Sequence, residues 1–194
     1  MNKIEKLVYN IYNLQCHIRT PYYNKTKFPV SVGTTTYGEI TYEGLEKLIE
    51  YFKKYFNKDT IFYDLGCGLG KMVIHIGLKY KIKKSCGIEY SKERYEGCMY
   101  NYNLCKNYNK NIEFINGSYY DIPLQDATVI YVDDTAFLDE EELKKLHSLS
   151  PVGCLVIHRN NIWGDENSKE TGKKNTYFPT TYCKEDPLFY YIKT

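Results

Sequence analysis

Three glycines alternate with other residues in the segment DLGCGLGK, at positions 66, 68 and 70. They follow an apolar run that ends in Asp64, and the residues after them have helical spacing. In a strand-to-helix turn, such glycines permit the tight turn, let the backbone approach a ligand closely, and let helix and strand pack together. A plain turn also uses glycine, but a buried strand before and a helix after are the context that a cofactor site requires. We therefore interpret Gly66, Gly68 and Gly70 as a cofactor-binding loop.

A carboxylate further along the chain indicates what the loop binds. The next apolar run, residues 85–90, contains Glu89, which lies about 20 residues beyond the loop. At that strand end a carboxylate is placed to accept hydrogen bonds from both ribose hydroxyls of an adenosine. The alternative is an acidic residue that caps the next helix. Because Glu89 occurs together with the glycine loop, we favour the ligand role.

Asp64 distinguishes between adenosine cofactors. The glycine spacing is G-x-G-x-G and not the G-x-G-x-x-G of dinucleotide-binding enzymes, and a pyrophosphate does not favour a carboxylate before the loop. A cationic sulfonium with an amino-acid portion tolerates one, because opposite charges attract. The pattern resembles motifs I and II of the S-adenosylmethionine-dependent class I methyltransferases. These enzymes contact adenine after the third strand, where Ser118 and Tyr119 lie, and Tyr119 is suited to stack on that ring.

Two further acids follow the fourth apolar run, VIYVDD. Asp133 and Asp134 lie at the carboxyl end of a predicted strand, the edge where open α/β sheets bind ligands. We expect Asp133 beside the methyl donor, whereas Asp134 or Thr135 is suited to cap the following helix. No Asn-Pro-Pro-Tyr or Asp-Pro-Pro-Tyr sequence, typical of enzymes that methylate amino groups of nucleic acids, is present. We expect no metal site, because further ligands are not evident beside these carboxylates.

The elements that position these residues alternate between strand and helix. Strands are predicted at 61–66, 85–90, 112–118, 127–134 and 153–159, and helices at 70–81, 91–108 and 137–149. This alternation predicts an α/β fold with a doubly wound, mostly parallel, Rossmann-like sheet. Residues 160–175 are polar and predict a loop, and the runs 176–183 and 187–194 predict an antiparallel hairpin, which makes seven strands.

The first 57 residues predict an N-terminal extension of helices and a loop. Residues 1–15 and 41–56 have the spacing of amphipathic helices. The connection between them is rich in Pro, Gly and Thr, and is long enough to suggest a binding loop or lid. We therefore expect one domain over residues 1–194, in which 1–57 carry the helices and the donor-covering loop, and 58–194 form the core.

The composition excludes several classes of protein. The net charge of +2 is too small to indicate nucleic-acid or membrane binding by itself. The 7 cysteines include no C-x-x-C pair, which favours reduced thiols in an intracellular protein. No apolar run approaches the roughly 18 residues of a membrane span. The 22 tyrosines, with many Asn and Lys, indicate AT-rich coding, which suits a parasite or a large DNA virus.

Three separated segments resemble one family, the non-SET histone lysine methyltransferases of the disruptor-of-telomeric-silencing type. YGEITYEGL (37–45) is similar to the family's Tyr-Gly-Glu loop. FYDLGCGLGK with GIEY is similar to its Asp-Leu-Gly-x-Gly-x-Gly turn and Val-Glu strand end, and VIYVDDTAF to its Val-Asn-Asn-Phe-Ala-Phe segment. The C-terminal PLFYYIKT resembles the closing strand, which supplies a tyrosine to the lysine channel. The resemblance runs from about residue 20 to the end of the chain.

The resemblance implies an S-adenosylmethionine-dependent protein-lysine N-methyltransferase that modifies a histone, in a nucleosome or free, or another chromatin-associated basic protein. It implies a nuclear location, or the host nucleus or cytoplasm for a viral or parasitic protein. The acceptor lysine would enter an aromatic channel as a neutral amine and attack in line. The residues that it assigns to catalysis are Asp133, Tyr190, Phe137 and Tyr182, and those that it assigns to covering the donor are Thr36, Tyr37, Glu39 and Ile40, with Glu39 near the methionine amino group.

The sequence departs from the family pattern at several positions. Asp133 and Asp134 replace the usual Asn-Asn. Asp133 is therefore expected to accept a hydrogen bond from a cationic lysine or to help deprotonate it, or else the replacement indicates a different methyl acceptor. Ser118 replaces a frequent acid, and Asp121 is the alternative adenine contact. Weak DNA contact is expected only from a small basic loop with Lys169, Lys173 and Lys174. Two alternatives stay open, a methyltransferase for RNA or a small molecule and a donor-binding fold without catalysis.

Overall fold

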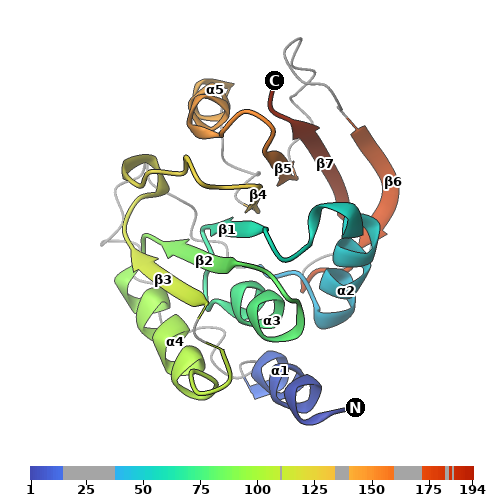
Figure 1. Ribbon diagram of the computed structural model, residues 1–194, viewed down its shortest axis with the longest axis vertical. Coiled ribbons are helices and arrows are strands. Elements are labelled where there is room, and N and C mark those ends of the chain that lie inside the picture. Colours follow the sequence, from blue (N-terminus) through green and yellow to red (C-terminus); the bar gives the residue numbers. More distant parts are fainter. Residues whose placement is uncertain (15–37, 110, 134–139, 160–171, 182–183, 185) are drawn as a thin grey trace.

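The computed structural model describes residues 1–14, 38–109, 111–133, 140–159, 172–181, 184 and 186–194. At its centre lies a seven-stranded sheet in the order β3-β2-β1-β4-β5-β7-β6 (Figure 1). The strands are β1 (Ile61–Leu65), β2 (Lys84–Glu89), β3 (Ile112–Asn116), β4 (Val129–Val132), β5 (Leu155–His158), β6 (Gly172–Phe178) and β7 (Asp186–Ile192). Neighbours among β1 to β5 are parallel, and β7 is antiparallel to β5 and β6. The predicted mostly parallel sheet with an antiparallel C-terminal hairpin is confirmed.

The central strands are buried along their whole length because helices cover both of their faces, and apart from Asp64 and His158 they carry apolar or aromatic side chains. Every residue of β1, β4 and β5 is buried. At the edge of the sheet, β3 alternates instead, with Ile112 buried and Glu113 exposed. This difference is the one expected between the centre and the edge of a parallel sheet.

The helices divide between the two faces of the sheet (Figure 1). They are α1 (Lys3–Leu14), α2 (Tyr42–Tyr51), α3 (Lys71–Lys79), α4 (Lys92–Asn103) and α5 (Glu140–Leu149), with the 3₁₀ helices η2 (Lys53–Tyr55) and η3 (Tyr119–Asp121). Apolar residues of α1 to α4 pack with Phe62 and Val129 in one core. On the other face, Leu146 of α5 packs with Tyr63 and Ile130. The sheet is therefore doubly wound, and α1 and α2 share a core with it.

The helix termini follow from local sequence. Asn2 and Glu5 exchange hydrogen bonds between side chain and backbone at the start of α1, a reciprocal capping arrangement. Thr41 and Ser91 cap α2 and α4 through their hydroxyl oxygens. The helix predicted for 91–108 ends at Asn103, where the chain tightens so that the N–H of Cys105 donates to the carbonyl of Tyr102 at 2.9 Å.

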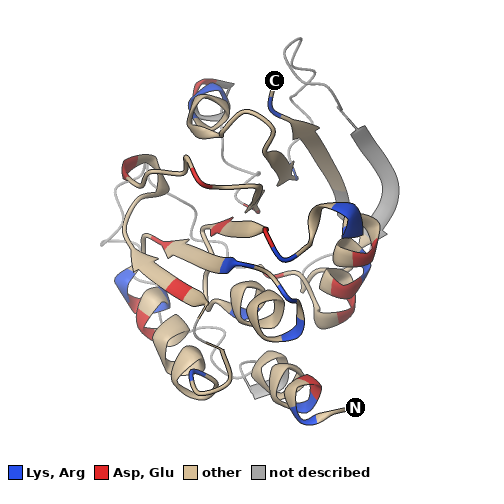
Figure 2. Cartoon of the chain, in the orientation of Figure 1, with Lys and Arg blue, Asp and Glu red and all other residues tan. Residues whose placement is uncertain are grey.

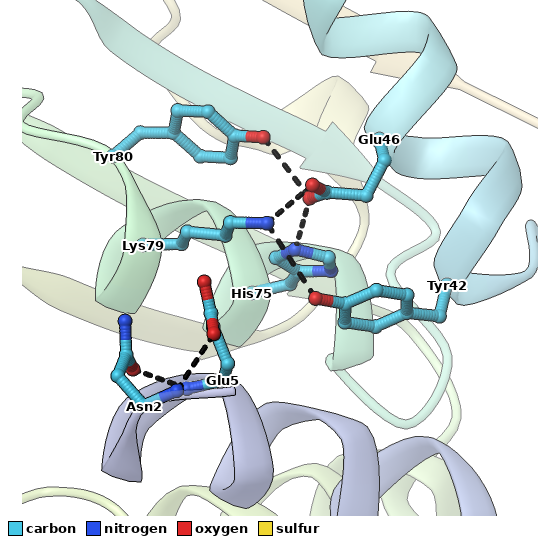
Figure 3. A network of polar contacts seen from close by, with 7 residues as sticks. All are labelled: Asn2, Glu5, Tyr42, Glu46, His75, Lys79 and Tyr80. Atoms are coloured by element: carbon cyan, nitrogen blue, oxygen red, sulfur yellow. Dashed lines mark hydrogen bonds and ion pairs between the residues drawn. The ribbon is translucent and has the colours of Figure 1, made fainter.

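A polar network joins α2 to α3 beside α1 (Figure 3). Glu46 of α2 accepts hydrogen bonds from His75 Nε2 at 2.7 Å and from the Tyr80 hydroxyl at 3.0 Å, and it also pairs with Lys79. Burial opposes the ionised form, but the hydrogen bonds from His75, Lys79 and Tyr80 lower the pKa of Glu46 to about 2. The His75 ring stacks on Tyr42, with centroids 4.8 Å apart. The network therefore fixes α2, which follows the Tyr-Gly-Glu segment, relative to α3, which follows the glycine loop.

The C-terminal hairpin differs from its prediction in position. The expected loop 160–175 is wrong over its last residues, because β6 begins at Gly172 and contains Lys173 and Lys174. Pairing of these two residues with Phe189 and Leu188 overrides their weak strand propensity, and lysines are common on edge strands, where they discourage pairing with other chains. The basic loop predicted for DNA contact is accordingly strand at these two lysines.

The ligand-type side chains, helices, cysteines and charges of the described residues complete the description of the fold. No group of three or more His, Cys, Asp or Glu side chains within them is arranged to hold a metal ion. No helix among the described ranges is long and apolar enough to cross a membrane. Their cysteines, Cys67, Cys86, Cys98, Cys105 and Cys154, are buried free thiols. Basic and acidic residues are mixed along α2 and α4 (Figure 2).

Candidate functional site

The glycine loop requires a backbone that only glycine adopts readily. Gly66, Gly68 and Gly70 have φ angles of 81°, 57° and 72°, whereas no other described residue type has a positive φ. The N–H groups of Gly66 and Cys67 both donate to the carbonyl of Ile88, at 2.9 and 3.0 Å, which fastens the loop to β2. A side chain at these positions would cost strain energy in the left-handed region. The predicted turn is therefore a built feature between β1 and α3.

Glu89 is fixed by the same loop. Its buried carboxylate accepts hydrogen bonds from the N–H of Gly68 at 2.9 Å and from the N–H of Ser91 at 2.8 Å. An ionised carboxylate is an acceptor only, so one held in this orientation is suited to hydroxyl donors such as those of a ribose. The structure thus brings the glycines and Glu89 together at the carboxyl ends of β1 and β2, as the sequence predicts.

Asp64 lies in a buried, acidic part of this edge. Burial raises the pKa of its carboxyl well above the usual range, and the carboxylates of Asp133, Glu89 and Glu39 raise it further. Three acids from three other segments therefore lie within electrostatic range of Asp64. Two of them form ion pairs, Glu39 with Lys71 at 2.6 Å and Asp133 with Arg159 at 2.7 Å. A cationic ligand would lower the pKa of Asp64 toward its ordinary value. The site fits a sulfonium with an amino-acid portion.

Lys71 is a residue that sequence reasoning missed. It is the first residue of α3, is buried, and its Nζ lies 2.6 Å from Oε2 of Glu39. This ion pair ties the Tyr-Gly-Glu segment to the glycine loop. A lysine in the first turn of a helix interacts unfavourably with the helix dipole. Its position at the start of the predicted helix was therefore the sequence signal that Lys71 has an acidic partner.

Asp133 has a partner that the sequence did not indicate. Its Oδ1 lies 2.7 Å from Nε of Arg159, which follows β5, and its Oδ2 accepts from the Tyr131 hydroxyl at 3.2 Å. Arg159 also donates to the Tyr131 oxygen from Nε and Nη2, at 3.3 and 3.2 Å. The Arg159 side chain is only 2% exposed, so the pair is largely withdrawn from water. The charge that distinguishes Asp133 from the asparagine of the family pattern is thus balanced by a buried arginine.

We expect strong coupling between Asp133 and Arg159 in a double-mutant cycle of unfolding free energies in urea. Asp133→Asn or Arg159→Met alone leaves a buried charge without its partner, which costs about 3–5 kcal/mol. The double variant removes both charges, so we expect it to recover at least about 1 kcal/mol relative to the sum of the singles.

The matched control for this cycle is the pair of Lys84 and Asp126, which are 2.9 Å apart but 20% and 49% exposed. Its coupling is expected to stay below about 1 kcal/mol. Additive losses at Asp133 and Arg159 would show that the two charges do not depend on each other.

Tyr190, predicted as a wall of the lysine channel, lies in β7 next to β5. Asp64, Tyr131, Ile157 and Tyr190 form one row across β1, β4, β5 and β7, so their side chains share the face that α1 to α4 cover. The Tyr190 ring packs edge-on against Phe52, with centroids 5.1 Å apart, at the end of α2. Its place in a lysine channel stays a prediction.

The predicted donor cover reaches the C-terminal hairpin. Ile40 is buried and forms a β-bridge with Thr180. The N–H of Glu39 donates to the Thr181 hydroxyl at 3.1 Å, and the N–H of Thr41 donates to the carbonyl of Pro179 at 2.9 Å. The strand expected at 176–183 therefore ends at Phe178, because the next residues pair with the Tyr-Gly-Glu segment instead of extending β6.

The remaining predicted residues fall into two groups. Ser118 caps η3, and the half-buried Tyr119 lies 4.5 Å from Tyr120 between ring centroids, next to the carboxyl end of β3. Their contact with adenine stays a prediction. The predicted residues Thr36, Tyr37, Phe137 and Tyr182, with Asp134 and Lys169, lie outside the described residues.

Comparison with known proteins identifies the family. The family described as "Histone methylation protein DOT1" matches residues 20–184, which include the Tyr-Gly-Glu segment, the glycine loop, Glu89 and Asp133. The chain belongs to the DOT1 family. The resemblance inferred from three sequence segments is thereby confirmed, and with it the class of S-adenosylmethionine-dependent methyltransferases.

Two curated relatives of this DOT1 chain are named as methyltransferases. A "Protein-lysine N-methyltransferase" of Saccharolobus islandicus is 30% identical over 110 residues, which are 56% of this chain and 67% of that enzyme. A "Histone-lysine N-methyltransferase, H3 lysine-79 specific" of Candida glabrata is 29% identical over 157 residues, which are 73% of this chain but 24% of that enzyme. The predicted activity, protein-lysine N-methylation, agrees with both names.

A solved structure supports the fold alone. An RNA methyltransferase of Salinibacter ruber in complex with S-adenosyl-L-homocysteine superposes with a TM-score of 0.59 at 17% identity, covering 77% of this chain and 90% of that one. At this identity the likeness shows that the DOT1 domain has the methyltransferase fold, and it says nothing of the acceptor.

Proposed function

We propose that this DOT1 chain transfers a methyl group from S-adenosylmethionine to a lysine side chain of a histone or another chromatin-associated basic protein. The observation that carries the proposal is the convergence of Glu39, Asp64, Glu89 and Asp133 at the carboxyl ends of β1, β2 and β4. A nucleotide phosphate would be repelled by this set of acids, whereas a sulfonium would be attracted. Family membership and the two lysine-modifying relatives support the choice of lysine.

The donor would be held at three points. Glu89 would accept from the ribose hydroxyls, and Glu39 would approach the methionine amino group while Thr36, Tyr37 and Ile40 cover the donor. Ser118 and Tyr119 would contact the adenine. The backbone of the glycine loop, fastened to β2, would allow the donor to approach closely.

The acceptor would be a neutral lysine amine, because an ammonium has no lone pair. Tyr190, Phe137 and Tyr182 would form apolar channel walls, which favour the neutral amine by desolvation. The amine nitrogen would attack the methyl carbon in line, forming an N–C bond as the C–S bond breaks. The electron pair stays on sulfur, giving the thioether, and the proton leaves the nitrogen to solvent. Asp133, held by Arg159 and Tyr131, would orient the amine as a fixed acceptor.

The acceptor class defines where the protein would act. A histone substrate implies that the protein acts in the nucleus, or in the host nucleus or cytoplasm if it is viral or parasitic. Lys173 and Lys174 on the edge strand β6, together with Lys169, would make at most a weak contact with DNA.

The test is methyl transfer from radiolabelled donor to a panel of free histones, nucleosomes and RNA, followed by mass spectrometry of the labelled product. We expect label on histone lysines with the wild-type chain and none with Glu89→Ala, which controls for a contaminating methyltransferase. Label confined to RNA or to a small molecule would overturn the lysine assignment. Donor binding without transfer to any acceptor would instead identify a fold that has lost catalysis.

A further inference from the structure

Tyr12, near the end of α1, reaches the edge of the donor site from outside the region that the family match covers. The match begins at residue 20. Helix α1 is nevertheless part of the core, because Val8 and Ile11 are each 1% exposed. The Tyr12 ring packs edge-on against Tyr42 and His75, with centroids 5.8 and 5.7 Å apart, so the stack drawn in Figure 3 supports it. Nζ of Lys71 lies 5.7 Å from the Tyr12 ring centre.

The Tyr12 hydroxyl is buried, and no described residue accepts or donates a hydrogen bond to it. Leaving a buried hydroxyl without a hydrogen-bond partner is unfavourable, so a bound ligand is a natural partner for it. Burial raises the pKa of Tyr12 well above its usual value, and the carboxylates of Glu39 and Asp64 raise it further. The phenol is therefore a protonated donor that lies within electrostatic range of the two acids of the donor site.

The neighbours of this hydroxyl indicate which part of the donor it would meet. Glu39 is suited to the methionine ammonium, and its partner Lys71 provides a positive charge 2.6 Å away. A carboxylate next to that ammonium would find Lys71 and a phenol O–H as complementary groups. The described structure places this pair beside Glu39.

We infer that α1 is part of the donor site, and that the Tyr12 hydroxyl donates a hydrogen bond to the α-carboxylate of bound S-adenosylmethionine. The inference rests on the proposed donor site. It assigns a ligand contact to a helix that the family match does not include, and it supplies a partner for a phenol that has none among the described residues.

The test is calorimetric titration of Tyr12→Phe with two ligands, S-adenosylmethionine and 5′-methylthioadenosine, which lacks the amino-acid portion. Phenylalanine keeps the ring contacts with Tyr42 and His75 and removes only the hydroxyl. We expect about tenfold weaker binding of S-adenosylmethionine, equivalent to about 1.4 kcal/mol, and unchanged binding of 5′-methylthioadenosine. The melting temperature of the ligand-free protein is expected to stay equal or rise, because an unpartnered polar group is lost.

The matched control is Tyr9→Phe on the same helix, which also packs edge-on against Tyr42, at 5.7 Å, but is 39% exposed. It is expected to bind both ligands as the wild type does. If Tyr12→Phe weakens the binding of both ligands equally, α1 acts through packing alone and the proposed hydrogen bond is wrong. If both affinities are unchanged, Tyr12 is a core residue without a ligand contact. If neither ligand binds the wild-type chain, the proposed donor site is wrong, and this outcome differs from the two that concern Tyr12 alone.

Discussion

Replacing Glu89 with alanine is expected to weaken S-adenosylmethionine binding at least a hundredfold. The carboxylate is buried and oriented by the N–H groups of Gly68 and Ser91, so little reorganisation precedes its bonds to the ribose. Each hydrogen bond to a charged group contributes about 1.5–3 kcal/mol, and the loss of two therefore amounts to at least about 3 kcal/mol. Titration calorimetry measures this loss directly, since 1.4 kcal/mol corresponds to a tenfold change in affinity.

Two controls separate binding from folding in this experiment. Glu96→Ala removes an exposed acid from the surface of α4 and is expected to leave the affinity unchanged. Urea unfolding of donor-free Glu89→Ala is expected to show a cooperative transition with a loss of about 1–3 kcal/mol, because two backbone donors lose their acceptor. A folded Glu89→Ala chain that binds the donor as tightly as the wild type would disprove the ribose assignment.

Replacing Gly70 with alanine is expected to lower the free energy of unfolding by about 3 kcal/mol. Gly70 has a φ of +72°, and an added Cβ would lie 2.5 Å from Sγ of Cys98 and 2.7 Å from the Phe114 ring. The left-handed conformation costs an alanine about 1–2 kcal/mol. Displacing a packed sulfur and an aromatic ring adds about 1–3 kcal/mol. Chemical denaturation of the donor-free protein provides the measurement.

Gly66→Ala is the matched variant, because it shares the strain without the collision. Its φ is +81°, but a Cβ there would meet no atom within 4 Å. We expect a loss of only about 1 kcal/mol in unfolding free energy at this position. Equal losses at both positions would mean that backbone strain alone explains the glycines, and that close packing of α3, α4 and β3 around Gly70 has no part.

The fold was predictable because its signals are local and repeated. The apolar runs at β1, β2 and β4 predict these strands within two residues at each end, and the periodic segment 70–81 predicts α3 equally well. The helix predicted for 91–108 begins within one residue of α4 but extends five residues past its end at Asn103. The errors in the C-terminal hairpin lie where pairing between distant segments determines whether a residue belongs to a strand. Lys173 and Lys174 have poor strand propensity but lie in β6 because they pair with β7. Residues 179–181 were expected in the hairpin but pair with residues 39–41 instead.

The site was predictable only for residues with a motif. The glycines, Asp64 and Glu89 are fixed by a strand–turn–helix context that a sequence displays. Arg159, Lys71 and Tyr12 have no such context, because each acquires its significance from a neighbour distant in sequence. Arg159 is significant because β5 lies beside β4, and Lys71 because the Glu39 segment folds over α3. One sequence shows the residue types, and the three-dimensional structure is needed to show the pairs.

The bond between Glu39 and Thr181 spans 142 positions of the chain. Contacts of such sequence separation carry the largest loop-closure entropy and tend to form late in folding. Before residues 179–181 are synthesised, the segment at residues 39–41 can form the ion pair between Glu39 and Lys71 but not its contacts with the C-terminal hairpin. A nascent chain that already carries the glycine loop and Glu89 would therefore still lack the contacts from Pro179, Thr180 and Thr181 that hold residues 39–41 in place.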